Sequence, residues 1–291
     1  ARAGKFGGGN ISVVTKSGTN EFHGTAFIEN VPWTGDAKDN RLNPGNEIEV
    51  SNDEESYGFT VGGPILKDKL FFFGAYEHWE EDVAFDYNLS NLEASGHDVT
   101  NAEVDQVVSI LQNTYGLTDS IGGAPAPNED EKILIKLDWN INSDHRADFT
   151  YSDQDTSELN GYTQYSDTVS LLSNQWTMAQ TNRFYTGHLY SDWSADFQTE
   201  ASLSYKEYKQ ASNTNSNWGE INIRTADGTV VAGQDENRQA NELANEVWNF
   251  GLHATYLAGD VEYKFGVEIE DTWNYNLYGR DSAGTWTFDS I

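Results

Sequence analysis

The sequence predicts an all-β fold, an antiparallel transmembrane β-barrel present in part, with about nine strands and one short helix in an external loop. Polar and apolar residues alternate along many stretches, some longer than ten residues. Short links join these stretches near residues 65–68, 142–145, 191–195 and 257–260. Long acidic spans separate the links, at about 31–55, 80–129, 157–174 and 211–243. Outer-membrane barrels have short periplasmic turns and long external loops, and short and long connections alternate in the same way here.

The charge balance restricts the class of partner. The chain has 291 residues, with 17 Lys and Arg against 47 Asp and Glu, a net charge of −30. Too few cations are present to neutralise the phosphates of a nucleic acid, so we expect no such partner. Two interpretations of the acidity stay open. It provides a solvated acidic surface, or the external loops hold divalent cations or attract a cationic ligand.

Cysteine content and hydropathy agree with a barrel. With no cysteine, the chain has neither disulfides nor thiolate metal sites. No apolar run approaches the roughly 20 residues of a membrane-spanning helix. The mean hydropathy of −0.65 does not argue against a barrel, because only every second side chain of a barrel strand faces lipid. The start of the sequence carries no secretory leader, so we expect a mature or excised segment.

The strands are expected in the following order. Early strands are predicted at 21–30, 56–64 and 69–79, and later ones at about 133–141, 147–152, 175–190, 196–208, 248–256 and 261–275. The clearest alternation begins at Ile133, with Ile135 and Leu137 on the same face. In the 196–208 strand, Leu203 and Tyr205 are predicted to face outward. The run Leu70-Phe71-Phe72-Phe73 breaks the alternation, so either face of it is expected to contact packed neighbours.

Strand length and aromatic residues distinguish a barrel from a β-sandwich. Sandwich strands average about 5–6 residues, whereas a strand that crosses a bilayer needs about 9–11. Aromatic residues near the strand ends are typical of interfacial girdles. Beside the short turns lie Trp139, Tyr190, Trp193 and Tyr256, and toward the opposite ends lie Trp176, Trp273 and Tyr275. The barrel is therefore preferred to the sandwich.

One helix is predicted within a long loop. Thr100 and Glu103 have the spacing of a capping box. Val104, Val107, Val108 and Leu111 then form an apolar stripe, and Gly116 offers a stop. The pattern favours a loop that packs on its own side chains, with a partner-binding helix as the alternative.

Catalytic and metal-binding motifs are missing. The six histidines lack zinc-site spacing, and no nucleophile elbow, phosphate loop or kinase loop occurs. We therefore predict neither an enzyme nor a cofactor. Two acidic groups carry the type of oxygen ligand that Ca²⁺ prefers, although neither has EF-hand spacing. They are Asp36, Asp39, Asn40 and Glu47 in the first loop, and Asp235, Glu236 and Glu242 in a later one. Solvated loops are the preferred interpretation, and loop-bound Ca²⁺ is the alternative.

Two motifs in the first quarter of the chain carry a family resemblance. Residues 6–24 read FGGGNISVVTKSGTNEFHG, and residues 62–74 read GGPILKDKLFFFG. The first resembles the passage from plug to barrel in TonB-dependent outer-membrane receptors of the Oar-like branch. The second resembles the second barrel strand, turn and third strand of that branch. Beyond these motifs, only the barrel pattern agrees.

The resemblance implies an outer-membrane receptor in which a plug fills a 22-stranded barrel and an inner-membrane complex pulls on the plug. Residues 1–20 would be the end of the plug domain and its junction, and residues 21–291 the N-terminal portion of the barrel. Most of the plug and more than half of the strands are expected to lie outside this sequence. The implied partners are outer-membrane lipid, the receptor's own plug and the TonB complex, and the ligand is not identified.

Two sets of residues are candidates for the function. External-loop aromatic residues are predicted to bind ligand: Trp33, Trp79, Tyr162, Tyr165 and Trp218. Charged inward residues are predicted to line the lumen or contact the plug: Lys136, Asp138, Glu200, Lys206, Glu262, Lys264, Glu268 and Glu270. For the second set, simple hydration of a wet interior is the alternative. The competing function is a secreted, soluble β-sandwich that binds carbohydrate or peptide.

Overall fold

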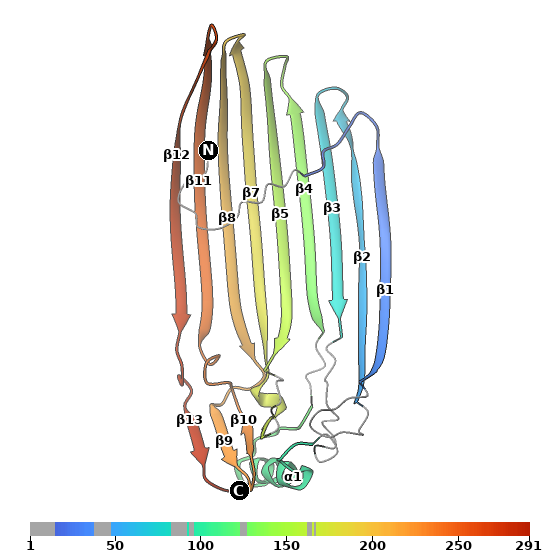
Figure 1. Cartoon of the computed structure of the whole chain (residues 1–291), viewed down its shortest axis with the longest axis vertical. Coiled ribbons are helices and arrows are strands. Elements are labelled where there is room, and N and C mark those ends of the chain that lie inside the picture. The colour runs from blue at the N-terminus through green and yellow to red at the C-terminus, as the bar shows by residue number, and fades with distance from the viewer. Residues whose placement is uncertain are drawn as a thin grey trace.

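Nine long strands dominate the computed structural model, which describes residues 15–37, 48–82, 92, 96–122, 127–161, 165 and 167–291 (Figure 1). They are β1 (His23–Ala37), β2 (Ile48–Leu66), β3 (Leu70–Glu81), β4 (Asn128–Asn140), β5 (His145–Asn160), β7 (Trp176–Ser194), β8 (Phe197–Thr214), β11 (Asn241–Ala258) and β12 (Val261–Tyr278). All nine predicted strands are therefore present, and most are longer than the alternation indicated.

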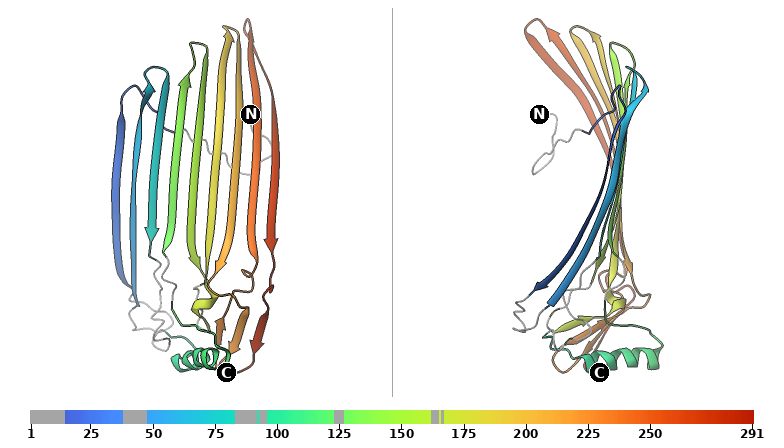
Figure 2. Two further views of the ribbon diagram at one scale, coloured as in Figure 1. Left: turned by 180° about the vertical axis from the view of Figure 1, so that it is seen from behind. Right: turned by 90° about the vertical axis from the view of Figure 1, so that its right-hand side faces the viewer.

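The long strands form a single curved sheet. Their order is β1-β2-β3-β4-β5-β7-β8-β11-β12, and each strand pairs antiparallel with its neighbour. Seen from the side, one face is concave, and we call it the inner face; the convex face is the outer face (Figure 2). Within the described ranges, no second sheet packs against either face. The sheet is therefore a barrel wall, as predicted, and not half of a sandwich.

The short turns lie together at one end of the sheet, and the long connections lie at the other (Figure 1). In the β2–β3 turn, Asp68 has a φ of 62°, and in the β11–β12 turn Gly259 has a φ of 61°. Asn142 closes the β4–β5 turn, where its Oδ1 accepts the N–H groups of Asp144 and His145. The first span predicted to be a loop is largely strand, because residues 31–37 of β1 pair with residues 48–54 of β2.

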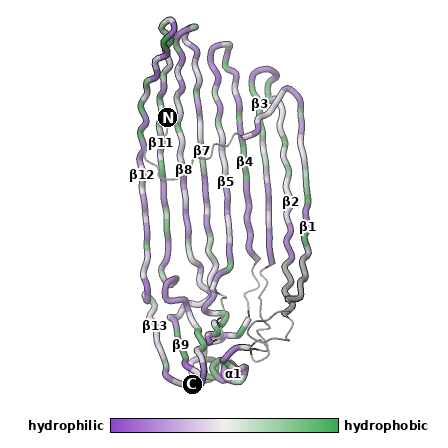
Figure 3. The backbone as a smooth tube through the Cα atoms, viewed as in Figure 1, coloured by the Kyte–Doolittle hydropathy of each residue, from purple (hydrophilic) through white to green (hydrophobic). Residues whose placement is uncertain are grey.

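The pairing register gathers residues of one kind on each face. One row across the outer face contains Leu137, Phe149, Leu203, Phe250 and Ile269. The adjacent row on the inner face contains Lys136, Thr150, Thr186, Ser204, Asn249 and Glu270. Hydropathy accordingly changes from residue to residue along the strands (Figure 3). This division matches the predicted facing, with the apolar side chains outward.

An aromatic ladder crosses the outer face. The ring centroids of Tyr151 and Tyr185 are 4.9 Å apart, those of Tyr185 and Tyr205 are 6.1 Å apart, and those of Tyr205 and Trp248 are 4.6 Å apart. The Tyr151 hydroxyl donates to Asp153 Oδ2 at 2.7 Å, so its polar end is directed toward the long-connection end. Aromatic residues with an apolar body and a polar tip suit the lipid–water interface. The ladder therefore marks the external boundary of the membrane.

The apolar band below this ladder is close in height to the apolar band of known outer-membrane barrels. In β8, the outward residues from Tyr205 back to Phe197 are Leu203, Ala201 and Thr199. Tyr205 and Phe197 are eight residues apart in the strand. With a rise of about 3.3 Å per residue and a strand tilt of about 40°, they are separated by roughly 20 Å along the membrane normal, close to the ~25 Å band of known barrels. Trp139, Trp193 and Tyr256 lie on the outer face near the turn end, as predicted. Tyr190 does not, because Arg146 of the inner face stacks on its ring.

A small folded unit occupies the long-connection end, which we call the external subdomain (Figure 1). Its four-stranded sheet has the order β13-β9-β10-β6. Its elements are β6 (Thr168–Ser170), β9 (Glu220–Arg224), β10 (Thr229–Ala232), β13 (Thr285–Phe288), α1 (Asn101–Ile110), the π-helical turn Leu111–Tyr115 and the 3-10 turn Leu172–Asn174. Sequence alternation did not indicate these short strands.

The predicted apolar stripe of α1 forms part of the core of this subdomain. Val104, Val107 and Leu111 are buried against Val169 and Val230 of the small sheet. The helix follows its capping box at Thr100, and the π turn ends at Gly116, whose φ is 69°. The stripe therefore stabilises a folded external loop, the interpretation that the sequence favoured.

The outer-face assignment gives a matched pair of substitutions in β8. Leu203→Arg should destabilise the folded full-length protein by about 2 kcal/mol, because a charged side chain on the lipid face costs roughly 2–4 kcal/mol near the midplane and less toward an interface. Ser204→Arg, on the adjacent inner-face position, should leave the free energy of unfolding nearly unchanged. Urea titrations in lipid vesicles measure both. Equal losses in the two variants would contradict the facing.

Candidate functional site

The chain segment that precedes β1 lies against the inner face of the wall. Lys136 Nζ donates to Ser17 Oγ at 2.9 Å. Asn20 and Asp68 form a two-way pair, in which Asn20 Nδ2 donates to Asp68 Oδ1 at 2.6 Å and the Asp68 N–H donates to Asn20 Oδ1 at 2.8 Å. Gly18 approaches the Phe72 carbonyl so closely that no Cβ would fit. These contacts bind residues 17–20 to the β2–β3 hairpin and β4.

The eight charged residues predicted to face inward all occupy inner-face positions of the register. Several are arranged in ion pairs, among them Lys136 with Asp138 at 3.5 Å and Lys264 with Glu262 at 2.7 Å. Glu268 lies 3.2 Å from His253. Lys136 is the member with a recorded contact to the segment before β1. For all eight residues, lining of the lumen or contact with the plug stays a prediction.

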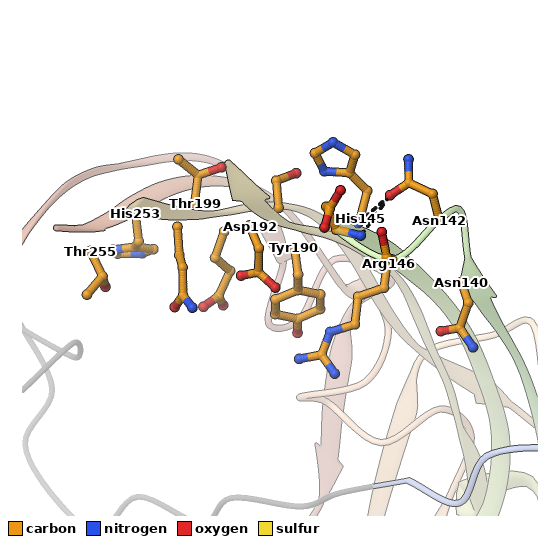
Figure 4. Close-up of a pocket in the computed structure, with 14 residues that line it drawn as sticks. Asn140, Asn142, His145, Arg146, Tyr190, Asp192, Thr199, His253 and Thr255 are labelled. Carbon is orange, nitrogen blue, oxygen red and sulfur yellow. Dashed lines mark hydrogen bonds between the residues drawn. The ribbon is translucent and has the colours of Figure 1, made fainter. Parts of the chain in front are cut away.

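A polar cleft of about 480 Å³ lies at the turn end of the inner face (Figure 4). Arg146 of β5 and Tyr190 of β7 form one side, with the guanidinium carbon 4.5 Å from the ring centroid. Glu200, His253 and Thr255 form the other. The side chains of Arg146, Tyr190 and Thr255 point into the hollow of the sheet. The sequence did not single out this cleft, because its residues come from five separate strands, β4, β5, β7, β8 and β11.

The predicted ligand-binding aromatic residues are not brought together. The backbone of Trp33 belongs to β1, its side chain lies outside the described part, and Tyr162 also lies outside it. Trp79 lies in β3 rather than in a loop, and its Nε1 donates to Glu54 Oε1 at 2.7 Å. Tyr165 is 65% exposed, whereas Trp218 packs on the core of the external subdomain. A role for these residues in ligand binding stays a prediction.

Asp119 joins three external connections at one point. Its carboxylate accepts the N–H of Ser120 at 2.9 Å, the N–H of Ser173 at 3.0 Å and the Ser173 hydroxyl. Ser173 Oγ in turn accepts the Gly233 N–H at 2.6 Å, and Asn174 Nδ2 donates to the Gly233 carbonyl at 3.0 Å. Burial raises the pKa of the Asp119 carboxyl, against the opposing effect of these hydrogen bonds.

Glu103 links α1 to the β9–β10 turn. Its carboxylate accepts the Thr100 N–H at 2.8 Å, which completes the capping box, and the Ala226 N–H at 3.0 Å. The hydrogen bond from Thr100 is the main reason that the pKa of Glu103 is lowered, and the bond from Ala226 adds to it. Two connections that are distant in sequence are therefore held by one carboxylate.

The described residues contain no group of three or more potential metal ligands. In the later acidic group, Asp235 Oδ1 accepts the Asn237 N–H at 2.8 Å, and Glu236 pairs with Arg280. Asp39, Asn40 and Glu47 lie outside the described part, as does the side chain of Asp36. In the same described part, no helix combines the length and apolar character needed for membrane crossing.

Asp119 provides a test of the external subdomain. Asp119→Ala should destabilise this unit by roughly 1–3 kcal/mol, because it leaves the N–H and hydroxyl donors of the buried Ser173 without their acceptor. Limited proteolysis of the full-length protein in detergent should then cut near residues 117–122, 171–175 and 233, while the wall strands stay protected. Asp105→Ala, on the exposed face of α1, is the control. An unchanged digestion pattern for Asp119→Ala would contradict this role.

Glu103 provides a test by pH. Because its pKa is lower in the folded state, its stabilisation is present above the ordinary Glu pKa and is lost as pH falls through the folded value. Hydrogen exchange of α1 should therefore accelerate below the ordinary Glu pKa in the wild type. Glu103→Gln, which keeps a capping oxygen but not the charge, should remove most of this pH dependence. If hydrogen exchange of α1 responds to acid in the same way in the variant and the wild type, Glu103 is not the source of the pH dependence.

Three comparisons with known proteins agree with this geometry. Residues 14–94 match the outer membrane beta barrel domain. The TonB-dependent transporter Oar of Myxococcus xanthus is 31% identical over 163 residues, a match that covers 53% of this chain and 14% of that protein. The chain therefore spans about a seventh of the length of this curated relative.

A solved structure has a similar fold. The outer membrane transporter YddB from Escherichia coli superposes with a TM-score of 0.58, over 93% of this chain and 33% of that chain. At 11% sequence identity, this is a likeness of fold. The resemblance to the Oar-like branch that the two N-terminal motifs indicated is thus confirmed. The chain has the fold of an outer-membrane β-barrel wall, is similar to the TonB-dependent transporter Oar, and has its place in the bacterial outer membrane.

Proposed function

We propose that this wall belongs to a TonB-dependent receptor, which binds a ligand on its external side and admits it through a plugged barrel. The observation that carries the proposal is the set of contacts between residues 17–20 and the inner face, through Lys136 and Asp68. A chain segment that enters the wall from its inner face is what a plug domain inside the barrel requires. The 31% sequence identity over 163 residues to the TonB-dependent transporter Oar supports the same function.

In this proposal the wall supplies three surfaces with different tasks. The outer face holds the protein in outer-membrane lipid. The ionic half of the inner face, with residues such as Arg146, Glu200 and Glu268, contacts the plug. The external end carries the ligand site, and the TonB complex acts on parts of the receptor outside this sequence. No step of this function requires covalent chemistry.

Energised cells provide the test, and the chain suits it because it contains no cysteine. Ser17→Cys in the full-length protein places the only thiol of these 291 residues where Lys136 contacts the segment before β1. If the TonB complex pulls on the plug, maleimide labelling of this thiol should rise in energised cells. A protonophore, or deletion of the host's tonB function, should cancel the rise.

Asp105→Cys is the control, because it lies on the exposed face of α1 and not on the inner face that the plug is proposed to contact. Its labelling should not depend on energy. Energy-independent labelling of Ser17→Cys would contradict coupling to TonB at this junction.

A further inference from the structure

The residue composition of the inner face changes beyond the aromatic ladder, on the side of the long connections. Two successive rows across β5, β7, β8, β11 and β12 contain ten residues, and seven of them are Asn or Gln. The amides are Gln154, Gln180, Asn182, Gln210, Asn245, Asn274 and Asn276, which we call the amide belt. The other three residues are Thr156, Tyr208 and Leu243. None of the ten is charged, in a chain with 22% charged residues.

The outer face at the same height has the opposite composition. The corresponding rows contain Asp153, Asp155, Arg183, Glu207, Lys209 and Glu246. Arg183 lies 3.2 Å from Asp153 and 3.6 Å from Glu207. If the inner face needed only hydration, charged residues would serve it as well as they serve the outer face. Across these five strands the inner face carries no charge in the two rows, whereas β4 and β3 continue the same rows with Lys132, Asp130 and Glu77. The uncharged stretch over β5 to β12 therefore indicates a different task.

The amide belt keeps hydrogen-bonding capacity for a ligand. The Tyr208 hydroxyl donates to Gln210 Oε1 at 2.7 Å and lies 3.3 Å from Gln180 Oε1, which holds both carboxamides in place by their oxygens. A primary amide has two N–H donors and an oxygen that accepts twice. The belt side chains are half-buried or exposed on the concave face. Some of their donors are already used, since Asn245 Nδ2 donates to Asn274 Oδ1 at 2.7 Å and Gln180 Nε2 lies 3.0 Å from Met178 Sδ. Within the described part, Gln210 Nε2 has no such partner, so its two N–H groups can bind a ligand.

The charged groups beside the belt form one cluster, in which a single lysine pairs with two carboxylates and a net negative charge remains. Lys132 Nζ lies 2.9 Å from Glu77 Oε1 and 3.0 Å from Asp130 Oδ2, and Gln154 Nε2 donates to Asp130 at 3.0 Å. Trp79, on the same face of β3, provides an aromatic surface at the margin. A surface of this kind offers no cationic site for an anionic ligand.

We propose that the amide belt binds an uncharged oligosaccharide. Hydroxyl groups both donate and accept, so they match paired amide donors and acceptors without requiring a charge. Aromatic side chains such as Tyr208 and Trp79 offer apolar faces to the C–H faces of sugar rings. A peptide would instead require apolar pockets for its side chains, and the ten positions contain one aliphatic residue, Leu243. This inference rests on the proposed transport function, since it names the class of ligand.

The test is binding to the purified full-length protein in detergent, without TonB or energy. The probes are neutral oligomers of glucose, xylose and mannose, alginate oligomers as the anionic class, chitosan oligomers as the cationic class, and a mixed peptide library. Isothermal titration calorimetry measures the dissociation constants. At least one neutral oligomer should bind, and the charged oligomers and peptides should bind more weakly.

Gln180→Glu with Gln210→Glu is the diagnostic double variant. It preserves the oxygens that accept from Tyr208 and removes the N–H donors, so binding of the neutral oligomer should weaken about tenfold, the effect of losing roughly one to two hydrogen bonds. Ala179→Glu with Ala211→Glu adds the same two charges to directly paired positions of the same strands on the outer face. This control should bind like the wild type.

Three results would overturn the inference: no neutral oligomer binds, a charged oligomer or a peptide binds more tightly, or both double variants behave alike. The energy-dependent labelling of Ser17→Cys is measured without any ligand. A failure of carbohydrate binding therefore leaves the transport proposal standing, and a failure of energy coupling leaves the binding result interpretable.

Discussion

The backbone hydrogen-bond ladder is the constraint on which the rest of this structure depends. In hydrocarbon, an N–H or C=O group without a partner costs several kcal/mol, so a wall of strands has to pair every strand with its neighbours. Once paired, each strand presents alternate side chains to lipid and to the interior. The apolar row through Leu203, the ionic row through Lys136 and the amide belt are all consequences of this single geometry.

Local patterns in the sequence predicted the strands and the helix. Features that depend on which strands lie side by side could not be predicted from such patterns. The alternation from Ile133 to Ile141 identifies a strand and its faces, and the capping box at Thr100 identifies the start of a helix. The aromatic ladder depends on register, because Tyr151, Tyr185 and Tyr205 become neighbours only when three strands align. The hydrogen bonds of Asp119 join residues more than 50 positions apart in the sequence, so no local pattern predicts them. The amide belt was missed for the same reason.

The external subdomain and the wall use polar residues in different ways. In the wall, ion pairs such as Arg183 with Asp153 lie within the sheet and link neighbouring strands. In the subdomain, single carboxylates satisfy backbone donors from several connections, as Glu103 does for Thr100 and Ala226. Burial raises the pKa of Asp119 against the effect of its hydrogen bonds, whereas hydrogen bonds lower the pKa of Glu103. Acid therefore relieves the cost of burying the Asp119 charge, but it removes stabilisation at Glu103. The subdomain therefore does not respond to acid as a single titrating unit.

The pair formed by Asn20 and Asp68 also bears on the order of assembly. A domain enclosed by a barrel has to be inside before the last strands close, or it has no route in. Asn20 contacts the first short turn, and Ser17 contacts β4, so both contacts involve the earliest strands of the wall. The segment before β1 can thus be positioned while the sheet is still an open ribbon. In the plugged receptor proposed above, closure would then follow around a chain that is already in place, without a threading step.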